Sequence, residues 1–213
     1  MYLRIKRLID LVGSATLIIL LMPVFVLVSI LIIIESKGAP IFRQERVGRN
    51  RESFNIYKFR TMLRLEDSYD DSGNELDNYS RVTKVGAFLR KTSLDETPQL
   101  LNILKGEMSF IGPRPTLEYQ VEKYGGFEEQ RLSVRPGVTG WAQVNGRNNI
   151  SWKRKIELDV YYVKNISFFL DMKIIFKTVK VVLSGQETEF VEHDELSRHD
   201  SSNWRENVSR KKK

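Results

Sequence analysis

Residues 11–34, LVGSATLIILLMPVFVLVSILIII, decide how this chain is organised. These 24 residues carry no charge, and most of them are Leu, Ile or Val. Because a helix needs about 20 apolar residues to cross the hydrocarbon core of a bilayer, we expect the segment to enter a membrane. Its apolar core is too long for a signal peptide, and no small-residue cleavage site follows it.

Positive charge flanks this apolar segment on both sides. The flanking cations are Arg4, Lys6 and Arg7 before it, and Lys37, Arg43, Arg46, Arg49 and Arg51 after it. Cations mark the cytoplasmic side of a membrane segment, and Pro23 removes a backbone donor and bends a helix. Two arrangements stay open: a re-entrant hairpin with both ends in the cytoplasm, and a single span with a kink.

The composition limits which side chains can take part in catalysis. The 213 residues suffice for one domain plus an anchor. The net charge of +7 suits an anionic partner, which includes nucleic acid, an anionic bilayer or a phosphorylated substrate. The chain has no cysteine, and its two histidines, His193 and His199, lie in a polar tail. Catalysis therefore falls to carboxylates, lysines, arginines, hydroxyls or a hard metal ion.

Turn residues and periodicity predict the elements after the anchor. Residues 40–46 and 53–61 form the arms of a β-hairpin around a turn at 47–50. The acidic residues 66–78 fit no register of a calcium-binding loop, so we expect a solvated loop.

Helices are predicted over residues 81–91 and 98–105, with Gly106 as the stop of the second. Loops dominate residues 108–147. Residues 167–183 are amphipathic, with an apolar stripe that either covers a core or lies in a membrane interface. The stripe consists of Phe169, Met172, Phe176, Val179 and Leu183.

Two adjacent acids, Asp95 and Glu96, lie at a predicted helix start. Either Ser93 forms a capping box with Glu96, or Thr97 caps a helix that begins with Pro98. In both cases the acids lie at the positive end of the helix. Ordinary capping explains such acids.

Asp95 also suits chemistry. The helix end and the nearby Arg90 and Lys91 are expected to keep it ionised near neutral pH. An ionised carboxylate beside cations can attack phosphorus or bind magnesium.

Further cations stand at stiff or extended positions. Arg114 lies between two prolines, either as a fixed phosphate ligand or as a solvated residue of a rigid turn. Lys58 and Arg60 share one strand face, either as ligands or on a solvated edge. Arg135 and Arg147 flank a glycine-containing loop in which Trp141 either stacks on a base or belongs to the core.

Five ordered motifs resemble the bacterial sugar transferase family, the monotopic polyprenyl-phosphate phosphoglycosyl transferases, in its minimal form. They are FRQERVG (42–48), YKFRTM (57–62), LRKTSLDETPQ (89–99), MSFIGPRP (108–115) and RPGVTG (135–140). The resemblance implies a mainly α fold with a small β-hairpin, a re-entrant helix-break-helix anchor and interfacial amphipathic helices. The family often has Ser before the breaking proline, where this chain has Met22 before Pro23.

The resemblance also implies a ping-pong reaction at the cytoplasmic face of the bacterial inner membrane. Asp95 attacks the sugar-linked phosphate of a UDP-sugar, UMP leaves, and polyprenyl phosphate takes the sugar phosphate from the aspartyl intermediate. Glu96 supports this step, and Mg²⁺ lies by Asp95 and the diphosphate. Phosphate or uridine contacts are expected from Arg90, Arg114, Lys58, Arg60, Arg135, Gly137, Thr139 and Arg147.

The implied organisation is an anchor over residues 1–36, a catalytic domain over 37–185 and a polar, disordered tail over 186–213. The implied partners are the UDP-sugar, polyprenyl phosphate, membrane lipid and downstream glycosyltransferases, without nucleic acid. The competing interpretation is a non-enzymatic, basic, membrane-anchored module that binds anionic lipid or nucleic acid. Only the enzyme needs Asp95 to be charged, so an Asp95→Asn variant separates the two.

Overall fold

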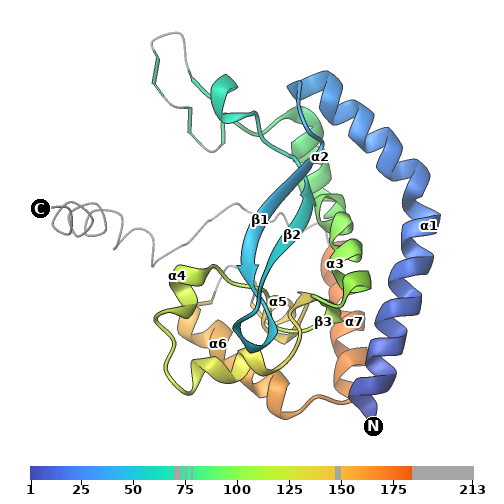
Figure 1. Ribbon diagram of the computed structural model, residues 1–213, viewed down its shortest axis with the longest axis vertical. Coiled ribbons are helices and arrows are strands. Elements are labelled where there is room, and N and C mark those ends of the chain that lie inside the picture. The colour runs from blue at the N-terminus through green and yellow to red at the C-terminus, as the bar shows by residue number, and fades with distance from the viewer. Residues whose placement is uncertain (70–72, 75, 78, 147–149, 184–213) are drawn as a thin grey trace, which may run out of the picture.

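The computed structural model describes residues 1–69, 73, 74, 76, 77, 79–146 and 150–183. This part is mainly helical with one small antiparallel hairpin, which confirms the predicted fold class (Figure 1). The α-helices are α1 (Tyr2–Ser36), α2 (Lys84–Lys91), α3 (Leu100–Lys105), α4 (Glu118–Val121), α5 (Trp141–Val144), α6 (Trp152–Lys164) and α7 (Phe168–Leu183). The strands are β1 (Ile41–Val47), β2 (Ser53–Phe59), β3 (Ser109–Ile111) and β4 (Gly137–Thr139). The 3₁₀ helices are η1 (Arg49–Arg51), η2 (Leu65–Asp67), η3 (Leu94–Gln99) and η4 (Glu128–Ser133).

Helix α1 is long and apolar enough to cross a membrane, but it is unbroken, so the predicted helix-break-helix is wrong in this respect. The helix continues through Pro23 to Ser36 and bends in its second half around the rest of the molecule (Figure 1). A proline lacks only its own donor, and a bend relieves the clash of its ring with the preceding turn. The neighbouring turns can therefore stay helical.

One face of α1 is buried against the rest of the chain. Its members recur every three or four residues, the spacing of one helix face. The buried residues are Asp10, Ser14, Val28, Ile32 and Ser36, and partly buried Ile18, Leu21 and Phe25 fill the gap between them. The other faces expose large apolar side chains, including Ile19, Leu20 and Ile34, which leaves them available to lipid.

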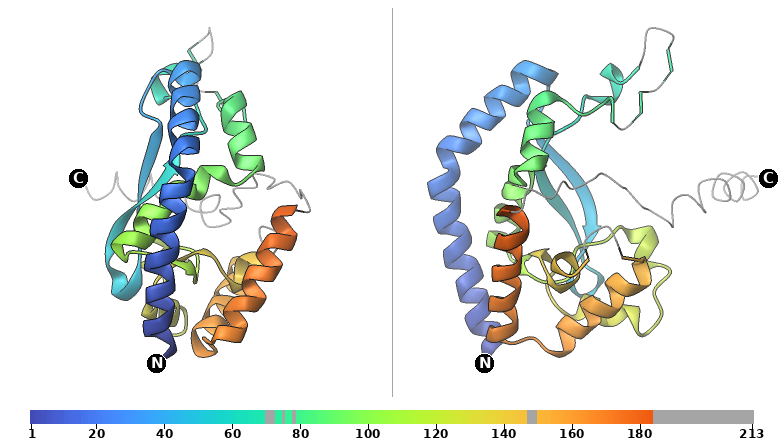
Figure 2. Two further views of the ribbon diagram at one scale, coloured as in Figure 1. Left: turned by 90° about the vertical axis from the view of Figure 1, so that its right-hand side faces the viewer. Right: turned by 180° about the vertical axis from the view of Figure 1, so that it is seen from behind.

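Both ends of α1 contact the same folded unit. Near the N-terminus, the Arg7 guanidinium donates to the carbonyls of Ile103 and Leu104, 2.6 and 3.0 Å away, at the C-terminal end of α3. Near the C-terminus, the Glu35 carboxylate accepts from the backbone N–H groups of Lys84 and Val85, at 2.8 and 2.9 Å, in the first turn of α2. The whole length of α1 is therefore held along one side of the molecule (Figure 2).

The β1–β2 hairpin matches its prediction closely. Its antiparallel register pairs Ile41 with Phe59 and Val47 with Ser53, and η1 forms the turn. Alternation along β2 turns Phe54 and Ile56 to one face, where they pack against Ile18, Leu21 and Phe25 of α1. Phe59, at the end of the strand and out of step with these two, is buried in a second cluster with Val28 and Ile32 of α1.

A second, parallel pair of strands lies within residues 108–147, where the sequence predicts mainly loops. In it Ser109 of β3 pairs with Gly137 of β4, and Ile111 pairs with Thr139. The backbones of Gly112 and Gly137 come so close that a Cβ on either residue would overlap the other strand. This contact fixes the start of the 112–116 loop, which carries Arg114.

Of the apolar stripe predicted on residues 167–183, Phe169, Phe176 and Val179 point outward, while Met172 is half-buried. Phe169 is 83% exposed and Phe176 is 74% exposed, whereas Asp171 and Ile174 on the opposite face are buried. Of the two interpretations, the core one is therefore wrong for the three exposed residues. Helices α1, α2 and α7 lie on the same side of the molecule (Figure 2), and both α1 and α7 expose large apolar side chains.

Candidate active site

The adjacent acids Asp95 and Glu96 lie in the first turn of η3, directly after a sharp change in chain direction. Ser93 takes a left-handed conformation with φ 57° between α2 and η3, and η3 then runs without interruption into α3. Neither predicted cap forms. The side chain of Ser93 makes no capping hydrogen bond, and the Thr97 hydroxyl lies inside the 3₁₀ helix and donates to the carbonyl of Leu94.

Glu96 is held by two cations from distant parts of the chain. Lys58 Nζ of β2 donates to its Oε1 at 2.8 Å, and Arg114 Nη2 donates to the same oxygen at 2.9 Å. Burial alone would raise the pKa of Glu96. The charges and hydrogen bonds of Arg114 and Lys58 together outweigh burial and hold this pKa well below its usual value. Glu96 therefore stays ionised and fixes both cations.

Asp95 differs from its neighbour because its carboxylate accepts no hydrogen bond from the residues that the structure describes. Burial, followed by repulsion from Glu96, raises the pKa of Asp95 to about 6 against the opposing charges of Lys58, Arg90 and Arg114. Cations alone would hold Asp95 ionised, as the sequence predicts, but burial and the second acid oppose them. Near neutral pH, Asp95 is largely an ionised carboxylate, and no residue in the described part of the chain donates a hydrogen bond to it.

Arg90 completes the group of cations at the end of α2. Its Nε donates to the Thr61 hydroxyl at 2.7 Å, and its charge lowers the pKa of Asp95. Helix α2 can approach the end of β2 because Gly86 has no Cβ, and a Cβ there would overlap the backbone of Thr61. Lys58, Arg90 and Arg114 thus surround the acids from three separate elements.

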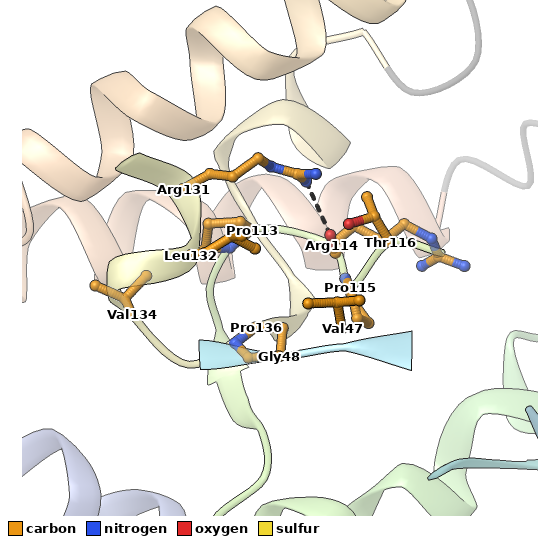
Figure 3. Close-up of a pocket in the computed structure, with 10 residues that line it drawn as sticks. All are labelled: Val47, Gly48, Pro113, Arg114, Pro115, Thr116, Arg131, Leu132, Val134 and Pro136. Atoms are coloured by element: carbon orange, nitrogen blue, oxygen red, sulfur yellow. Dashed lines mark hydrogen bonds between the residues drawn. The ribbon is translucent and has the colours of Figure 1, made fainter. Parts of the chain in front are cut away.

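A buried ion pair supports the loop of Arg114. Arg131 Nη2 donates to the Arg114 carbonyl at 2.8 Å and to Asp159 Oδ2 at 2.6 Å, and both charged side chains are buried. Burial alone would lower the pKa of the Arg131 guanidinium, but Asp159 and Tyr124 together outweigh burial and raise this pKa. Figure 3 shows Arg131 contacting the backbone of Arg114 from one side of the loop, while the Arg114 side chain extends away from it.

Sequence patterns missed this supporting pair. Arg131 and Asp159 lie 28 residues apart, and no local motif connects them. The one available signal was Asp159 itself, which lies between Leu158 and Val160 on the apolar side of a helix. An acid at a buried position needs a charged or hydrogen-bonding partner, so this pattern indicates that a partner exists but not which residue it is.

Other predicted ligands lie elsewhere. Arg60 donates to the Ser36 hydroxyl at the end of α1, so the strand face shared with Lys58 does not bring both cations to the acids. Arg135 donates to the Gly106 carbonyl near the N-terminal end of α1, which we call the foot of α1. Gly137 packs within the parallel strand pair, and the Thr139 hydroxyl contacts that of Thr178 in α7. Arg147 and the tail 186–213 lie outside the described residues.

Carboxylates with hydrogen-bond capacity to spare are ligands that Mg²⁺ prefers. Asp95 meets this condition, whereas Glu96 is already engaged by two cations. Within the described ranges, no group of three or more His, Cys, Asp or Glu side chains is close enough to hold a metal ion. The chain itself therefore offers one carboxylate at this place, which suits an ion whose remaining ligands are phosphate oxygens and water.

Comparisons with known proteins find several relatives named as sugar transferases or sugar phosphotransferases. An uncharacterized sugar transferase, EpsL of Bacillus subtilis, is 46% identical over 190 residues, covering 89% of this chain and 92% of that protein. The UDP-galactose-lipid carrier transferase of Erwinia amylovora is 42% identical over 84% of this chain, and the undecaprenyl-phosphate galactose phosphotransferase of Salmonella typhimurium is 37% identical over 84%. This chain spans 40% of the length of each of these two. The model of the family described as "Bacterial sugar transferase" matches residues 1–185, and the chain belongs to that family.

Proposed function

We propose that this chain transfers a sugar-1-phosphate from a UDP-sugar to polyprenyl phosphate, with release of UMP. The observation that carries the proposal is Asp95, an ionisable carboxylate that lies among three cations and accepts no hydrogen bond from the described residues. Family membership supports it, as does the Salmonella relative, whose name gives undecaprenyl phosphate as its acceptor. The product would be the lipid-linked sugar that downstream glycosyltransferases extend.

In the first step, an Asp95 carboxylate oxygen attacks the sugar-linked phosphorus of the UDP-sugar. The bond from this phosphorus to the bridging oxygen breaks, and UMP leaves with the electron pair. The main obstacle is repulsion between two anions. Lys58, Arg90 and Arg114 stand within electrostatic reach of Asp95, and fixed cations lower this repulsion without having to reorganise.

In the second step, a phosphate oxygen of the lipid acceptor attacks the same phosphorus. The bond between phosphorus and the Asp95 oxygen breaks, which restores the carboxylate and gives the polyprenyl diphosphate sugar. Glu96 acts as a positioning residue, because its Oε1 fixes both Lys58 and Arg114. We assign Mg²⁺ to Asp95, where its charge would neutralise part of the diphosphate.

We further propose that both ends of α1 lie at the cytoplasmic face of the bacterial inner membrane. A straight span would separate its ends by the bilayer core of about 30 Å. Arg7 and Glu35, near opposite ends of α1, contact the same folded unit, and cations flank both ends. Helix α1 would therefore enter and leave on one side, with α7 in the interface. Since the chain has no cysteine, single cysteines near each end should react with a membrane-impermeant maleimide from the cytoplasmic side only.

UMP release tests the reaction. Full-length protein would receive a panel of UDP-sugars with Mg²⁺ and undecaprenyl phosphate. We expect UMP from one or two donors, no UMP in EDTA, and a loss of at least about a thousandfold for Asp95→Asn. Asp67→Asn is the matched control, because Asp67 is an exposed carboxylate that pairs with Arg64 away from the acids. It should keep full activity.

A second measurement separates the ping-pong route from direct transfer. Without acceptor, donor labelled at the sugar-linked phosphate should release at most one UMP per enzyme and leave label on the wild type. Asp95→Asn should carry no label. UMP that forms only with acceptor present would exclude the aspartyl intermediate. No UMP from any donor, with lipid binding unchanged in Asp95→Asn, would favour the non-enzymatic anchored module.

A further inference from the structure

A second concave site lies at the foot of α1. It is a cavity of about 80 Å³ between the first turns of α1, the turn of the β1–β2 hairpin and the segment before β4. Charged residues that line it include Lys6, Arg7, Asp10, Arg49 and Arg135. None of these five residues has a hydrogen bond or ion pair to Asp95 or Glu96 within the described structure, so the site is separate from the candidate active site.

Positive charge exceeds negative charge in this cavity. Lys6 is neutralised by Asp171, 2.7 Å away. That leaves Arg7, Arg49 and Arg135 against Asp10 alone, whose Oδ1 already accepts hydrogen bonds from the Ser109 hydroxyl and the Phe110 N–H, both at 3.1 Å.

The arginines influence one another. Burial, followed by repulsion from Arg7 and Arg49, lowers the pKa of Arg135. Cations held close enough to repel one another are stabilised by an anion between them.

Two of these arginines are held in place by backbone carbonyls and keep donors to spare. Arg7 donates to Ile103 and Leu104, and Arg135 Nε donates to Gly106. A guanidinium has five N–H donors in a planar fork, so these bonds fix each group without exhausting it. Arg49 is exposed, and its side chain makes no hydrogen bond or ion pair with the residues that the structure describes.

The surroundings of the cavity are apolar and exposed. Leu3 lines the cavity and is 58% exposed, and Ile166 lines it just before α7, where Phe168 and Phe169 are exposed. A ligand with a charged group and attached acyl chains matches this boundary, since headgroup phosphates lie at the same level as interfacial aromatic residues.

We propose that the cavity formed by Arg7, Arg49 and Arg135 binds a phosphate group, presented by the headgroup of an anionic phospholipid. Arginine suits this ligand because its fork donates two parallel hydrogen bonds to phosphate oxygens. The site would fix the foot of α1 and the hairpin turn against the lipid surface. It does not depend on the proposed reaction, because the acceptor and the UDP-sugar are assigned to a different group of cations.

Calorimetric titration tests this site in the full-length protein in a nonionic detergent. Dihexanoyl-phosphatidylglycerol is the lipid probe, inorganic phosphate is the free-anion probe, and dihexanoyl-phosphatidylcholine tests the need for net negative charge. The variant is Arg49→Gln, whose side chain holds no other element in place. Its matched control is Arg51→Gln, two residues along the same turn, where Arg51 is exposed and paired with Glu129.

We expect Arg49→Gln to weaken phosphatidylglycerol binding about fivefold and Arg51→Gln to change it less than about twofold. Phosphatidylcholine should bind more weakly than phosphatidylglycerol. Inorganic phosphate binding with the same dependence on Arg49 would support the phosphate pocket and identify a free anion as a second source. Equal weakening by both variants would reduce the effect to diffuse surface charge and overturn the proposal. If neither phosphatidylglycerol nor inorganic phosphate binds, the proposal is also overturned.

Discussion

Carboxylates lie beside arginines at two places in this molecule, and the two places differ in whether each carboxylate has its own cationic partner. At the support of the 112–116 loop, Asp159 and Arg131 are paired one to one, and both are buried. At the candidate active site, Glu96 accepts hydrogen bonds from two cations, whereas Asp95 accepts none from the residues that the structure describes. A matched charge pair can hold a loop, whereas an unmatched carboxylate keeps the lone pairs that a nucleophile needs. The same substitution, Asp→Asn, should therefore have opposite effects at the two places.

The largest stability change should come from the matched pair. Asp159→Asn leaves the Arg131 guanidinium buried without its counter-charge, so we expect about 3–5 kcal/mol of destabilisation. Thermal unfolding in detergent, monitored by tryptophan fluorescence, measures this change. A melting temperature equal to that of the wild type would mean that the pair contributes nothing to the fold, and the comparison would fail.

The next effect concerns Arg114, which connects the two places. Arg114→Gln should lower kcat/KM about a hundredfold, because a fixed cation at the reacting phosphate is lost, with little change in melting temperature. Arg154→Gln is the matched control. Arg154 is also about half exposed and bonds to one glutamate, Glu157, at 2.8 Å. Equal activity of the two variants would remove Arg114 from the mechanism.

Asp95→Asn should raise stability, by roughly 1–2 kcal/mol at pH 7, while it abolishes activity. Because the pKa of Asp95 is raised to about 6 in the folded state, its ionised form destabilises the protein above that pH. As pH falls from about 6 towards the usual aspartate value, wild-type Asp95 becomes protonated and the advantage of the variant shrinks. Chemical denaturation at pH 7 and at pH 4 measures both stabilities. A variant less stable than the wild type at pH 7 would show that Asp95 is a structural partner.

The smallest expected effect is the dependence of kcat/KM on pH. Since only the ionised carboxylate attacks, kcat/KM should fall to about half near pH 6 and about tenfold per unit below it. Glu96→Gln removes a neighbouring negative charge, so the midpoint should move to lower pH. A midpoint unchanged in Glu96→Gln would mean that the two acids do not interact. UMP release at limiting UDP-sugar gives both profiles.

Local sequence signals predicted the local structure. Turn chemistry and alternation located the β1–β2 hairpin to within two residues at each end, and Gly106 ended α3 as expected. The parallel β3–β4 pair was missed because its strands lie 26 residues apart and are only three residues long. In α1, the uniform hydropathy hid a second pattern, the buried stripe from Asp10 to Ser36, because its apolar members cannot be told by residue type from the exposed apolar residues around them.

The candidate site was predicted in its parts but not in its electrostatics. The motifs named Asp95, Glu96, Lys58, Arg90 and Arg114, and the fold brings these five residues together. Their roles stay predictions. The raised pKa of Asp95 depends on burial, which no linear motif reports. Arg135 was grouped with the nucleotide loop by sequence proximity, whereas the strand pairing carries it to the foot of α1.

The contact between Glu35 and the first turn of α2 has a mechanical consequence. It joins the last turn of the apolar helix to the element that carries Arg90 and leads within four residues to Asp95. If α1 lies in the lipid as proposed, its depth would set the height of the Asp95 carboxylate above the lipid surface. On the proposed function, a helix of fixed length would then hold the carboxylate at the level of the acceptor phosphate in every turnover.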